Sequence, residues 1–322
     1  MLQLKNFSHR QGVHCSSTAI GDIARFDGIE LSEPMVFGLG EGLGFVYYED
    51  EALSPVSRFN GRASNFEEKF YQRIETPLSW QGSWQASTIA DSIRNNRPII
   101  AKTSIAGLPY YQPADFFGHG VLVVGLDENA EQVEIAESFS EELQHISIAQ
   151  FKQAVAGNYP PFMTAYSYTS APEMRFSPSS DMIKDSITAT LKSLLSADHA
   201  LEGVAAMERA IEAIPQWAQT KDWQWHARFA YQSIEKRGTG GGNFRFLYAD
   251  FIKETYRYLP RLRNCNADIA FRESAEQWQA LAHIFKTIFI KQEPEGFIAA
   301  AAQLKHIKKL EVTRCKTILK TI

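Results

Sequence analysis

The pattern of apolar residues changes near residue 180, and this change limits the folds open to the chain. Residues 1–165 mix short strand patterns, glycines and helical patterns, whereas residues 158–180 are rich in proline and serine, as at a boundary. Later segments repeat apolar residues at helical spacing, and they are 182–195, 201–214, 226–234, 244–259, 269–288 and 297–310. We therefore predict an α+β domain over 1–165, a linker over 166–180 and an α-helical domain over 181–322.

The dipeptide His14-Cys15 lies where an N-terminal coil turns into a predicted helix. Apolar residues from Ala19 to Phe26 follow helical spacing, and Gly28 stands where a left-handed C-terminal cap belongs. Cys15 thus falls in the first turn, where the helix dipole stabilises a thiolate and makes the sulfur a nucleophile near neutral pH. The alternative is a small buried apolar residue, which is what most free cysteines are.

A nucleophilic thiol needs a base, and a predicted β-hairpin supplies a candidate. Its strands are expected at 121–126 and 132–136, with the turn at 127–129. Centring the hairpin on Glu128 places His119 directly opposite Glu137, with side chains on one face and Cβ atoms roughly 5 Å apart. A slip of one residue would place them on opposite faces. The alternative is an exposed histidine beside a solvated glutamate.

Together these placements give a cysteine at a helix start, a histidine opening a strand about 100 residues later, and a carboxylate closing the next strand. This is the chain order of papain-like cysteine hydrolases and transferases. We therefore expect a papain-like first domain in which Cys15 is the nucleophile, His119 the base and Glu137 the orienting group.

Several blocks of the sequence resemble the butirosin biosynthesis protein H family. Those that resemble its N-terminal domain are GVHC at 12–15, SEPMVFG at 32–38, LPY at 108–110 and the strand that follows His119. The glycine-rich stretch at 238–245 and the block at 247–251 resemble the helical domain of uncharacterised function that accompanies it. The resemblance runs from about residue 12 to about residue 290.

The resemblance implies a cysteine-dependent acyltransferase in specialised metabolite or antibiotic biosynthesis. The family's namesake moves an amino-acyl group from the thioester of an acyl carrier protein to an amine of an aminoglycoside. By this likeness Cys15 accepts the acyl group and His119 is the general base, whereas Glu137 stands where the family more usually has aspartate. No permanently bound cofactor is implied, because the phosphopantetheine thioester is a substrate. The small-molecule acceptor, an amine or hydroxyl, does not follow from the family.

An acyl-transfer site also needs oxyanion and substrate contacts. The backbone N–H of Cys15 is the expected oxyanion donor, with a second from Gln11 or His14, although His14 could equally be structural. Glu33 could recognise an amine or be a solvated surface carboxylate. Tyr110, from the LPY block, is a further candidate for substrate binding.

Two glycine-rich stretches invite a search for phosphate sites. Residues 38–44 lack the third glycine of a dinucleotide loop, so a close backbone approach beside the active site, or tight turns, are expected there. Residues 238–242 precede Asn243, a candidate N-cap for the helix at 244–259. With Arg245 that loop could bind a phosphopantetheine phosphate or an acceptor carboxylate. The alternative is a flexible interhelical loop with a cap.

Composition sets the remaining expectations. The net charge of −4 and the lack of a basic block argue against nucleic acid. We see no signal peptide, no membrane span and no histidine pattern for a metal, and three cysteines without a CxxC fit reduced thiols in the cytoplasm. The basic tail at 305–320 could meet an acidic carrier protein or be a solvated face. A homodimer is possible, but no heptad seam predicts one.

Three function classes stay open. The favoured one is an acyltransferase that uses a carrier-bound or similar thioester. The second is a peptidase or amidohydrolase with the same three residues, which would use water as the acceptor. The third is a non-catalytic binding protein on the same fold, in which His119 and Glu137 would be accidental neighbours.

Overall fold

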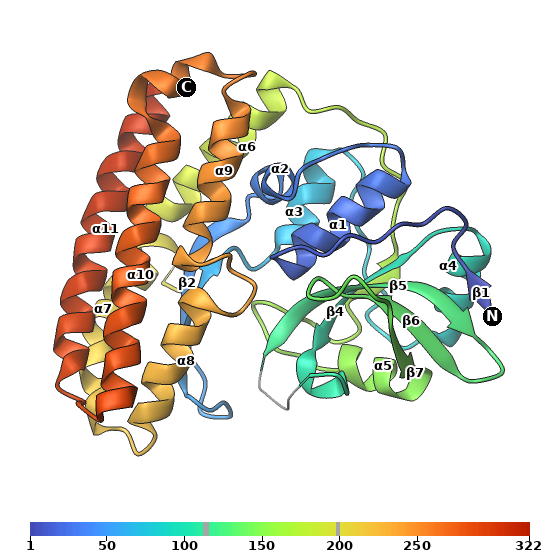
Figure 1. The fold of residues 1–322 in the computed structure, drawn as a ribbon, viewed down its shortest axis with the longest axis horizontal. Coiled ribbons are helices and arrows are strands. Elements are labelled where there is room, and N and C mark those ends of the chain that lie inside the picture. The colour runs from blue at the N-terminus through green and yellow to red at the C-terminus, as the bar shows by residue number, and fades with distance from the viewer. Residues whose placement is uncertain (112–115, 198–199) are drawn as a thin grey trace. The chain divides into compact units, whose positions relative to one another are not determined.

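The computed structural model describes residues 1–111, 116–197 and 200–322 (Figure 1). Its contacts divide the chain into two compact units, Met1–Val36 with Ser64–Ser177, and Phe37–Ala63 with Pro178–Ile322. The predicted order, a region containing a sheet followed by a helical region, is confirmed. Residues 37–63 differ from the expected division, because they pack in the second unit and not in the first.

The first unit is built on an antiparallel sheet with the order β7-β6-β5-β4-β8, and β1 pairs with β5. The predicted hairpin is confirmed as β5 and β6. The strands are β1 (Leu2–Gln3), β4 (Ile99–Ser104), β5 (Phe117–Asp127), β6 (Gln132–Ala136), β7 (Gln144–Ser147) and β8 (Tyr168–Ser170).

Helices cover this sheet because its strands carry buried apolar side chains, and β5 is buried along almost its whole length. Ile89 of α4 and Phe151 of α5 join Val121, Val123 and Ile135 of the sheet in one buried core. The helices of this unit, with α2 running across the boundary, are α1 (Cys15–Phe26), α2 (Glu33–Leu39), α3 (Phe66–Arg73), α4 (Ala86–Arg94), η1 (Ile105–Gly107) and α5 (Ile148–Val155).

Helix α1 begins at Cys15, as the sequence predicts. His14 is its N-cap, and its side chain accepts the N–H of Ser17. Ile20 and Ile23 are fully buried, which accounts for the apolar spacing of this segment. Gly28 follows the helix with φ of +81°, the left-handed conformation that glycine adopts most readily. The predicted helix and its cap are therefore confirmed.

The second unit contains all six predicted helices together with a hairpin. The helix expected at 244–259 begins one residue later and ends four residues earlier, and the last helix continues to Thr321. Figure 1 shows α10 and α11 side by side. The elements are β2 (Leu43–Glu49), β3 (Ser57–Arg62), α6 (Ser180–Leu195), α7 (Gly203–Ala213), η2 (Ile214–Gln219), α8 (Trp223–Glu235), η3 (Gly242–Phe244), α9 (Arg245–Thr255), η4 (Pro260–Cys265), α10 (Ala267–Lys291) and α11 (Gly296–Thr321).

The hairpin of β2 and β3 joins the helices through its aromatic side chains. The rings of Phe45 and Phe59 stack with centroids 5.8 Å apart, and the Phe45 ring lies 5.7 Å from that of Trp278 on α10. Burial of these aromatic rings stabilises the packing of the hairpin on the helices. This explains why residues 37–63 belong to the second unit although they precede most of the first unit in the chain. A Cβ on Gly38 would lie 2.2 Å from the Phe251 ring, so the close approach expected in residues 38–44 occurs within the second unit.

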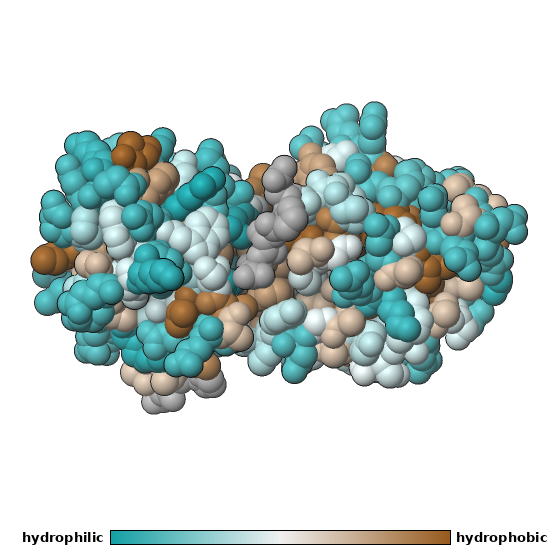
Figure 2. All heavy atoms as spheres, turned by 90° about the horizontal axis from the view of Figure 1, so that it is seen from below, coloured by the Kyte–Doolittle hydropathy of each residue, from teal (hydrophilic) through white to brown (hydrophobic). Residues whose placement is uncertain are grey.

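The surface that Figure 2 displays is mainly hydrophilic, with apolar residues in small separate patches. Isolated apolar residues of this kind are usual on folded proteins. The large apolar side chains that are exposed are those of Met1, Val13, Phe139, Leu201, Ile269, Ile290 and Ile298. Within the described ranges, no helix combines the length and the apolar character that crossing a bilayer requires.

Candidate active site

His119 and Glu137 form a buried pair in the first unit. The Nε2 atom of His119 donates to both carboxylate oxygens of Glu137, at 2.8 Å and 3.0 Å. His119 is 5 % exposed and Glu137 is 0 % exposed, so little water competes for this contact. The carboxylate therefore fixes the plane of the imidazole ring, as an orienting group must.

The register that leads to this contact differs from the predicted one. Leu122 pairs with Ala136. If the strands continue in this register, Glu137 lies opposite Val121 and not opposite His119. His119 then lies diagonally across from Glu137, two residues away on the same face. Diagonal neighbours have Cβ atoms roughly 7–8 Å apart, which long side chains can bridge. The predicted contact is present, but the predicted register is wrong by two residues.

A β-bulge in β5 decides which face His119 occupies. The register shifts by one residue between Val123 and Gly125. Without this shift Glu137 would fall opposite Leu122, and His119 would then lie on the other face of the sheet. Bulges commonly re-aim a side chain next to a site in this way. Gly125, a glycine inside a strand, is a local signal for such a bulge, and the predicted register did not use it.

Cys15 lies beside the imidazole of His119. Burial acts to lower the pKa of His119, but the charge of Glu137 and the charge and hydrogen bond of Cys15 raise it to about 10. Because Glu137 occupies Nε2, the nitrogen left for the sulfur is Nδ1. Cys15 itself is 8 % exposed. The three predicted residues thus meet in one place, and the raised pKa of His119 favours its imidazolium form.

A glycine lets the start of α1 approach β5. A Cβ on Gly120 would lie 2.6 Å from the Oγ atom of Ser16 and 3.0 Å from its Cα atom, which real contacts do not tolerate. The Ser16 hydroxyl donates to Glu67 at 2.5 Å, and Glu67 lies 3.1 Å from the Nζ atom of Lys102. This buried network holds the first turn of the helix against the strand that carries His119. Sequence reasoning missed it, since Glu67 and Lys102 are distant in the chain and have no local pattern.

Two tyrosines complete the shell around Glu137. The hydroxyl of Tyr110 donates to its Oε1 atom at 3.1 Å, and that of Tyr111 donates to its Oε2 atom at 3.3 Å. The Tyr111 hydroxyl also lies 3.3 Å from the Nε2 atom of His119. Burial and then the charge of Glu137 raise the pKa of both hydroxyls, so both stay protonated and donate. Tyr110, predicted to bind substrate, contacts the orienting carboxylate, and Tyr111 was not predicted at all.

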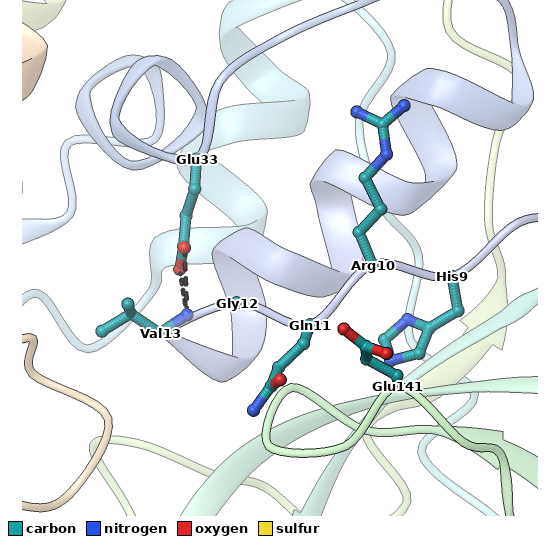
Figure 3. A pocket seen from close by; sticks show the side chains of 7 residues that line it. All are labelled: His9, Arg10, Gln11, Gly12, Val13, Glu33 and Glu141. Carbon is teal, nitrogen blue, oxygen red and sulfur yellow. Dashed lines mark hydrogen bonds between the residues drawn. The ribbon is translucent and has the colours of Figure 1, made fainter.

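Glu33 has a structural contact that neither sequence interpretation included. Its carboxylate accepts the backbone N–H of Val13 at 3.1 Å and 3.0 Å (Figure 3). It also accepts the backbone N–H of His14, at 2.6 Å. The Ser17 hydroxyl also donates to it, at 3.1 Å. A carboxylate at a helix start is favourable, because it satisfies backbone donors and complements the dipole. Glu33 thus holds the segment that leads into Cys15.

The two other candidates near the sulfur also have structural contacts. The side-chain amide of Gln11 donates to the carbonyl of Phe139 at 2.7 Å, so that N–H is already used. His14 is buried as the N-cap of α1, and its ring meets that of Phe66 edge-on at 5.3 Å. Of the two readings left open for His14, these contacts support the structural one.

The proposed anion site at Asn243 and Arg245 is corrected by the structure. Asn243 has φ of +54° and is not the N-cap, because α9 begins at Arg245 after Phe244. The Arg245 guanidinium is 0 % exposed and pairs with Glu311 at 2.8 Å and 3.0 Å. Its Nη1 atom donates to three backbone carbonyls, those of Gly44, Gly61 and Asn243. An arginine enclosed by these partners holds the core of the second unit together and has no face for an anion.

Comparison with known families agrees with this layout. Residues 14–138 match the family described as butirosin biosynthesis protein H, N-terminal, and residues 150–318 match a domain of unknown function (DUF4872). The chain belongs to the family that combines these two domains. The first match covers Cys15, His119 and Glu137, and the second covers most of the helical unit. No curated protein matches the chain.

Members of this family are associated with antibiotic biosynthesis, and the matched domain suggests a biosynthetic enzyme. Among the residues that the structure describes, no group of three or more metal-ligating side chains occurs.

Proposed function

We propose that the chain is a cysteine-dependent acyltransferase, built on a papain-like first unit, that forms an acyl-Cys15 intermediate. The observation that carries the proposal is the juxtaposition of Cys15, His119 and Glu137, with Nε2 of His119 bound to Glu137 and Cys15 beside the ring. A nucleophile, a base and an orienting group in this order are the parts that covalent acyl transfer requires.

The first step is formation of the acyl-enzyme. The Cys15 thiolate attacks the carbonyl carbon of a thioester, and the backbone N–H of Cys15 at the start of α1 stabilises the oxyanion. The new bond joins Sγ to the acyl carbon, and the bond from the acyl carbon to the donor sulfur breaks. The imidazolium of His119 gives its proton to the departing sulfur, which leaves as a thiol.

The second step transfers the acyl group. Neutral His119 takes a proton from an amine or hydroxyl as that group attacks the acyl carbon. The bond to Sγ breaks, and the thiolate returns beside the imidazolium. Because a thioester is already activated, the enzyme's main tasks are to position the acceptor and to exclude water. With water as acceptor the same residues would act as a hydrolase.

The donor that we propose is the phosphopantetheine thioester of an acyl carrier protein, and the acceptor is a small molecule with an amine or hydroxyl. The biosynthetic association of the family supports this choice over a peptide substrate. We propose that an acidic carrier protein contacts the basic residues of α11. Two of these residues, Lys308 and Arg314, form ion pairs with Glu208 and Glu273 in the structure.

Mass spectrometry of the intact chain tests the proposal. After incubation with acyl thioesters of N-acetylcysteamine, which carry the reactive end of phosphopantetheine, we expect one acyl group on Cys15 that an amine discharges. Cys15→Ala and His119→Ala are each expected to abolish adduct formation and turnover, since each removes a reacting group.

Cys265→Ala is the matched control, because Cys265 is partly exposed and its thiol donates only to the carbonyl of Leu262. This variant should form the adduct at the wild-type rate. The proposal fails if the wild type forms no adduct with any donor thioester, or if Cys15→Ala retains turnover. Release of free acid without transfer to any acceptor would support the hydrolase instead.

A further inference from the structure

Apart from the residues of the proposed site, His9 in the first unit makes close polar contacts through both of its ring nitrogens. Its Nδ1 atom lies 2.5 Å from Oδ2 of Asp22, and its Nε2 atom lies 2.9 Å from the carbonyl of Glu137 and 2.8 Å from that of Ser140. The side chain of His9 is 5 % exposed and that of Asp22 is 1 % exposed. All of these partners are oxygens that accept hydrogen bonds.

The acceptors around both ring nitrogens define the charge state of His9. A neutral imidazole carries one N–H, so one of its nitrogens would face an acceptor oxygen without a proton. Leaving such a pair unmade inside a protein is costly. Only the imidazolium, with a proton on each nitrogen, satisfies both sides. Burial acts to lower the pKa of His9, but the hydrogen bond and charge of Asp22 and the two carbonyls outweigh it and raise that pKa.

The partners of His9 belong to the two elements that must meet for catalysis. Asp22 lies on α1, the helix that begins at Cys15, and the carbonyls belong to the segment that starts at Glu137. The N–H of Gly12 donates to the carbonyl of Ser138 at 2.9 Å, and Gln11 reaches Phe139, so residues 9–12 run along residues 137–140. Within this contact between residues 9–12 and residues 137–140, His9 is the hydrogen-bond donor that carries a charge.

Other charged groups surround His9 without replacing its contacts. Arg25 donates to Oδ1 of Asp22 at 2.7 Å, leaving Oδ2 for His9, and the backbone N–H of Arg10 also reaches Oδ1. Glu141 lines the same open pocket of about 780 Å³ as His9 and Arg10 (Figure 3). Of these groups, Asp22 supplies the charge that favours the imidazolium.

We propose that the imidazolium of His9 is a positioning residue that fixes the backbone of Glu137 relative to the Cys15 helix. The proposal rests on the proposed function for its consequence in catalysis, since a displaced Glu137 would no longer orient His119. The bridge itself is independent of that function and can be measured alone.

Long-range ¹H–¹⁵N spectra of the histidine rings in the ¹⁵N-labelled chain test the bridge. We expect both ring nitrogens of His9 to be protonated at pH 7.5, with the assignment given by the signals that His9→Gln removes. A single protonated nitrogen at that pH would overturn the proposal. If His9→Gln fails to fold, His119→Ala keeps the point testable: His119 also has a raised pKa, so the imidazolium signals that remain at pH 7.5 without it must include those of His9, and their absence overturns the proposal.

The rate of Cys15 acylation tests the positioning role. His9→Gln keeps an amide donor but loses the charge and one contact, and we expect acylation to slow on the order of 10- to 100-fold, since small displacements near reacting groups have effects of this size. The ring signals of His119 should shift in the same variant. His145→Gln is the matched control, since its side chain is 50 % exposed, and should acylate at the wild-type rate.

The two proposals fail in different ways. If the wild type forms no acyl adduct but His9 is doubly protonated and His9→Gln shifts the His119 signals, the proposed function is wrong and the positioning role stands. If the wild type is acylated and folded His9→Gln is acylated equally fast, the positioning role is wrong and the proposed function stands.

Discussion

Glu137 lies just beyond the end of β6, diagonally across from His119. Sequence reasoning expected directly opposed residues, for which the extra methylene of glutamate over aspartate is a disadvantage. In the diagonal arrangement the longer side chain of glutamate is an advantage, because the Cβ atoms are farther apart. It spans this distance and still places both carboxylate oxygens within 3.0 Å of the Nε2 atom of His119. Tyr110 and Tyr111 then hold the carboxylate from the other side.

Replacing Glu137 should separate the effect of its charge from that of its length. Glu137→Gln is expected to slow Cys15 acylation on the order of 10²- to 10⁴-fold, by analogy with orienting residues elsewhere, yet less than His119→Ala. Glu137→Asp, which keeps the charge on a shorter arm, should fall between wild type and Glu137→Gln. The rates are measured with a thioester donor, or with iodoacetamide as a probe of the thiolate.

The assignment of Glu137 is tested further by the pH dependence of the Cys15 acylation rate, compared between the wild type and Glu137→Gln. In the wild type His119 keeps its proton until the pH rises through its raised pKa, about 10. Glu137→Gln removes the largest raising influence while burial still lowers the pKa, so His119 should lose its proton, and the site its ion pair, at lower pH. If the acylation rate of Glu137→Gln falls at the same high pH as that of the wild type, Glu137 is not the group that orients His119.

Two irregularities in β5 show how far the sequence could predict this site at the level of the element. Hydrophobic spacing predicts α1 and the hairpin, because the apolar residues of each follow the period of a helix or of a strand and are bounded by turn residues. The register depends on a bulge between Val123 and Gly125, and a second shift occurs near Gly118, whose φ is +70°. Apolar alternation does not specify such extra residues, since valines occupy both faces of the buried strand. The site was predicted through its residue types, and its exact register was not.

The same limit applies to residues whose role depends on distant neighbours. Arg245 follows a glycine-rich loop, and sequence alone allows it to bind an anion as readily as a buried carboxylate. Its partner Glu311 lies 66 residues away on the last helix. Likewise Asp22 and His9 have no motif, and only the fold brings both ring nitrogens of His9 to acceptors. Long-range pairing of this kind leaves no local signal.

Contact between α1 and β5 predicts a sharp effect at Gly120. In Gly120→Ala the new methyl would lie 2.6 Å from the Ser16 hydroxyl and 3.0 Å from its Cα atom, so the first turn of α1 must move. We expect the free energy of unfolding to fall by about 1–3 kcal/mol, as in other overpacked sites. Acylation should slow as well, because Cys15 moves with the turn. Urea unfolding and the acylation rate measure the two effects.

Gly21→Ala on the same helix is the matched control. A Cβ at Gly21 has no neighbour within 4 Å, and alanine is preferred to glycine inside a helix by roughly 0.5–1 kcal/mol. This variant should be as stable as the wild type or more so, with unchanged acylation. If Gly120→Ala behaves like Gly21→Ala, the close packing of α1 on β5 does not matter for either property.

Across the whole molecule, buried groups of the two units contribute to stability over different pH ranges. The pKa values of His9 and His119 in the first unit are raised, so their contribution is present below the usual histidine pKa of 6.5 and is lost as the pH rises through the raised values. In the second unit burial would raise the pKa of Glu311, but Arg245, Ser274 and Trp278 lower it below 4.5. That contribution is complete above the usual carboxyl pKa and is lost as the pH falls through the lowered value.

Glu311→Gln tests how the ion pair of Arg245 and Glu311 contributes to the free energy of unfolding as the pH falls. Removing the carboxylate leaves the Arg245 guanidinium buried without its charged partner, and we expect a loss of about 3–5 kcal/mol near neutral pH. The loss should shrink as the pH falls below 4.5, because protonation of Glu311 removes the same charge from the wild type. Urea unfolding followed by tryptophan fluorescence measures the loss, and Trp278, which donates to Glu311 at 2.9 Å, lies beside the altered pair. Glu208→Gln, which removes an exposed partner of Lys308, should change stability by less than about 1 kcal/mol at every pH. Equal losses in the two variants, or a loss in Glu311→Gln that does not change with pH, would mean that the buried pair does not set the acid stability of the helical unit.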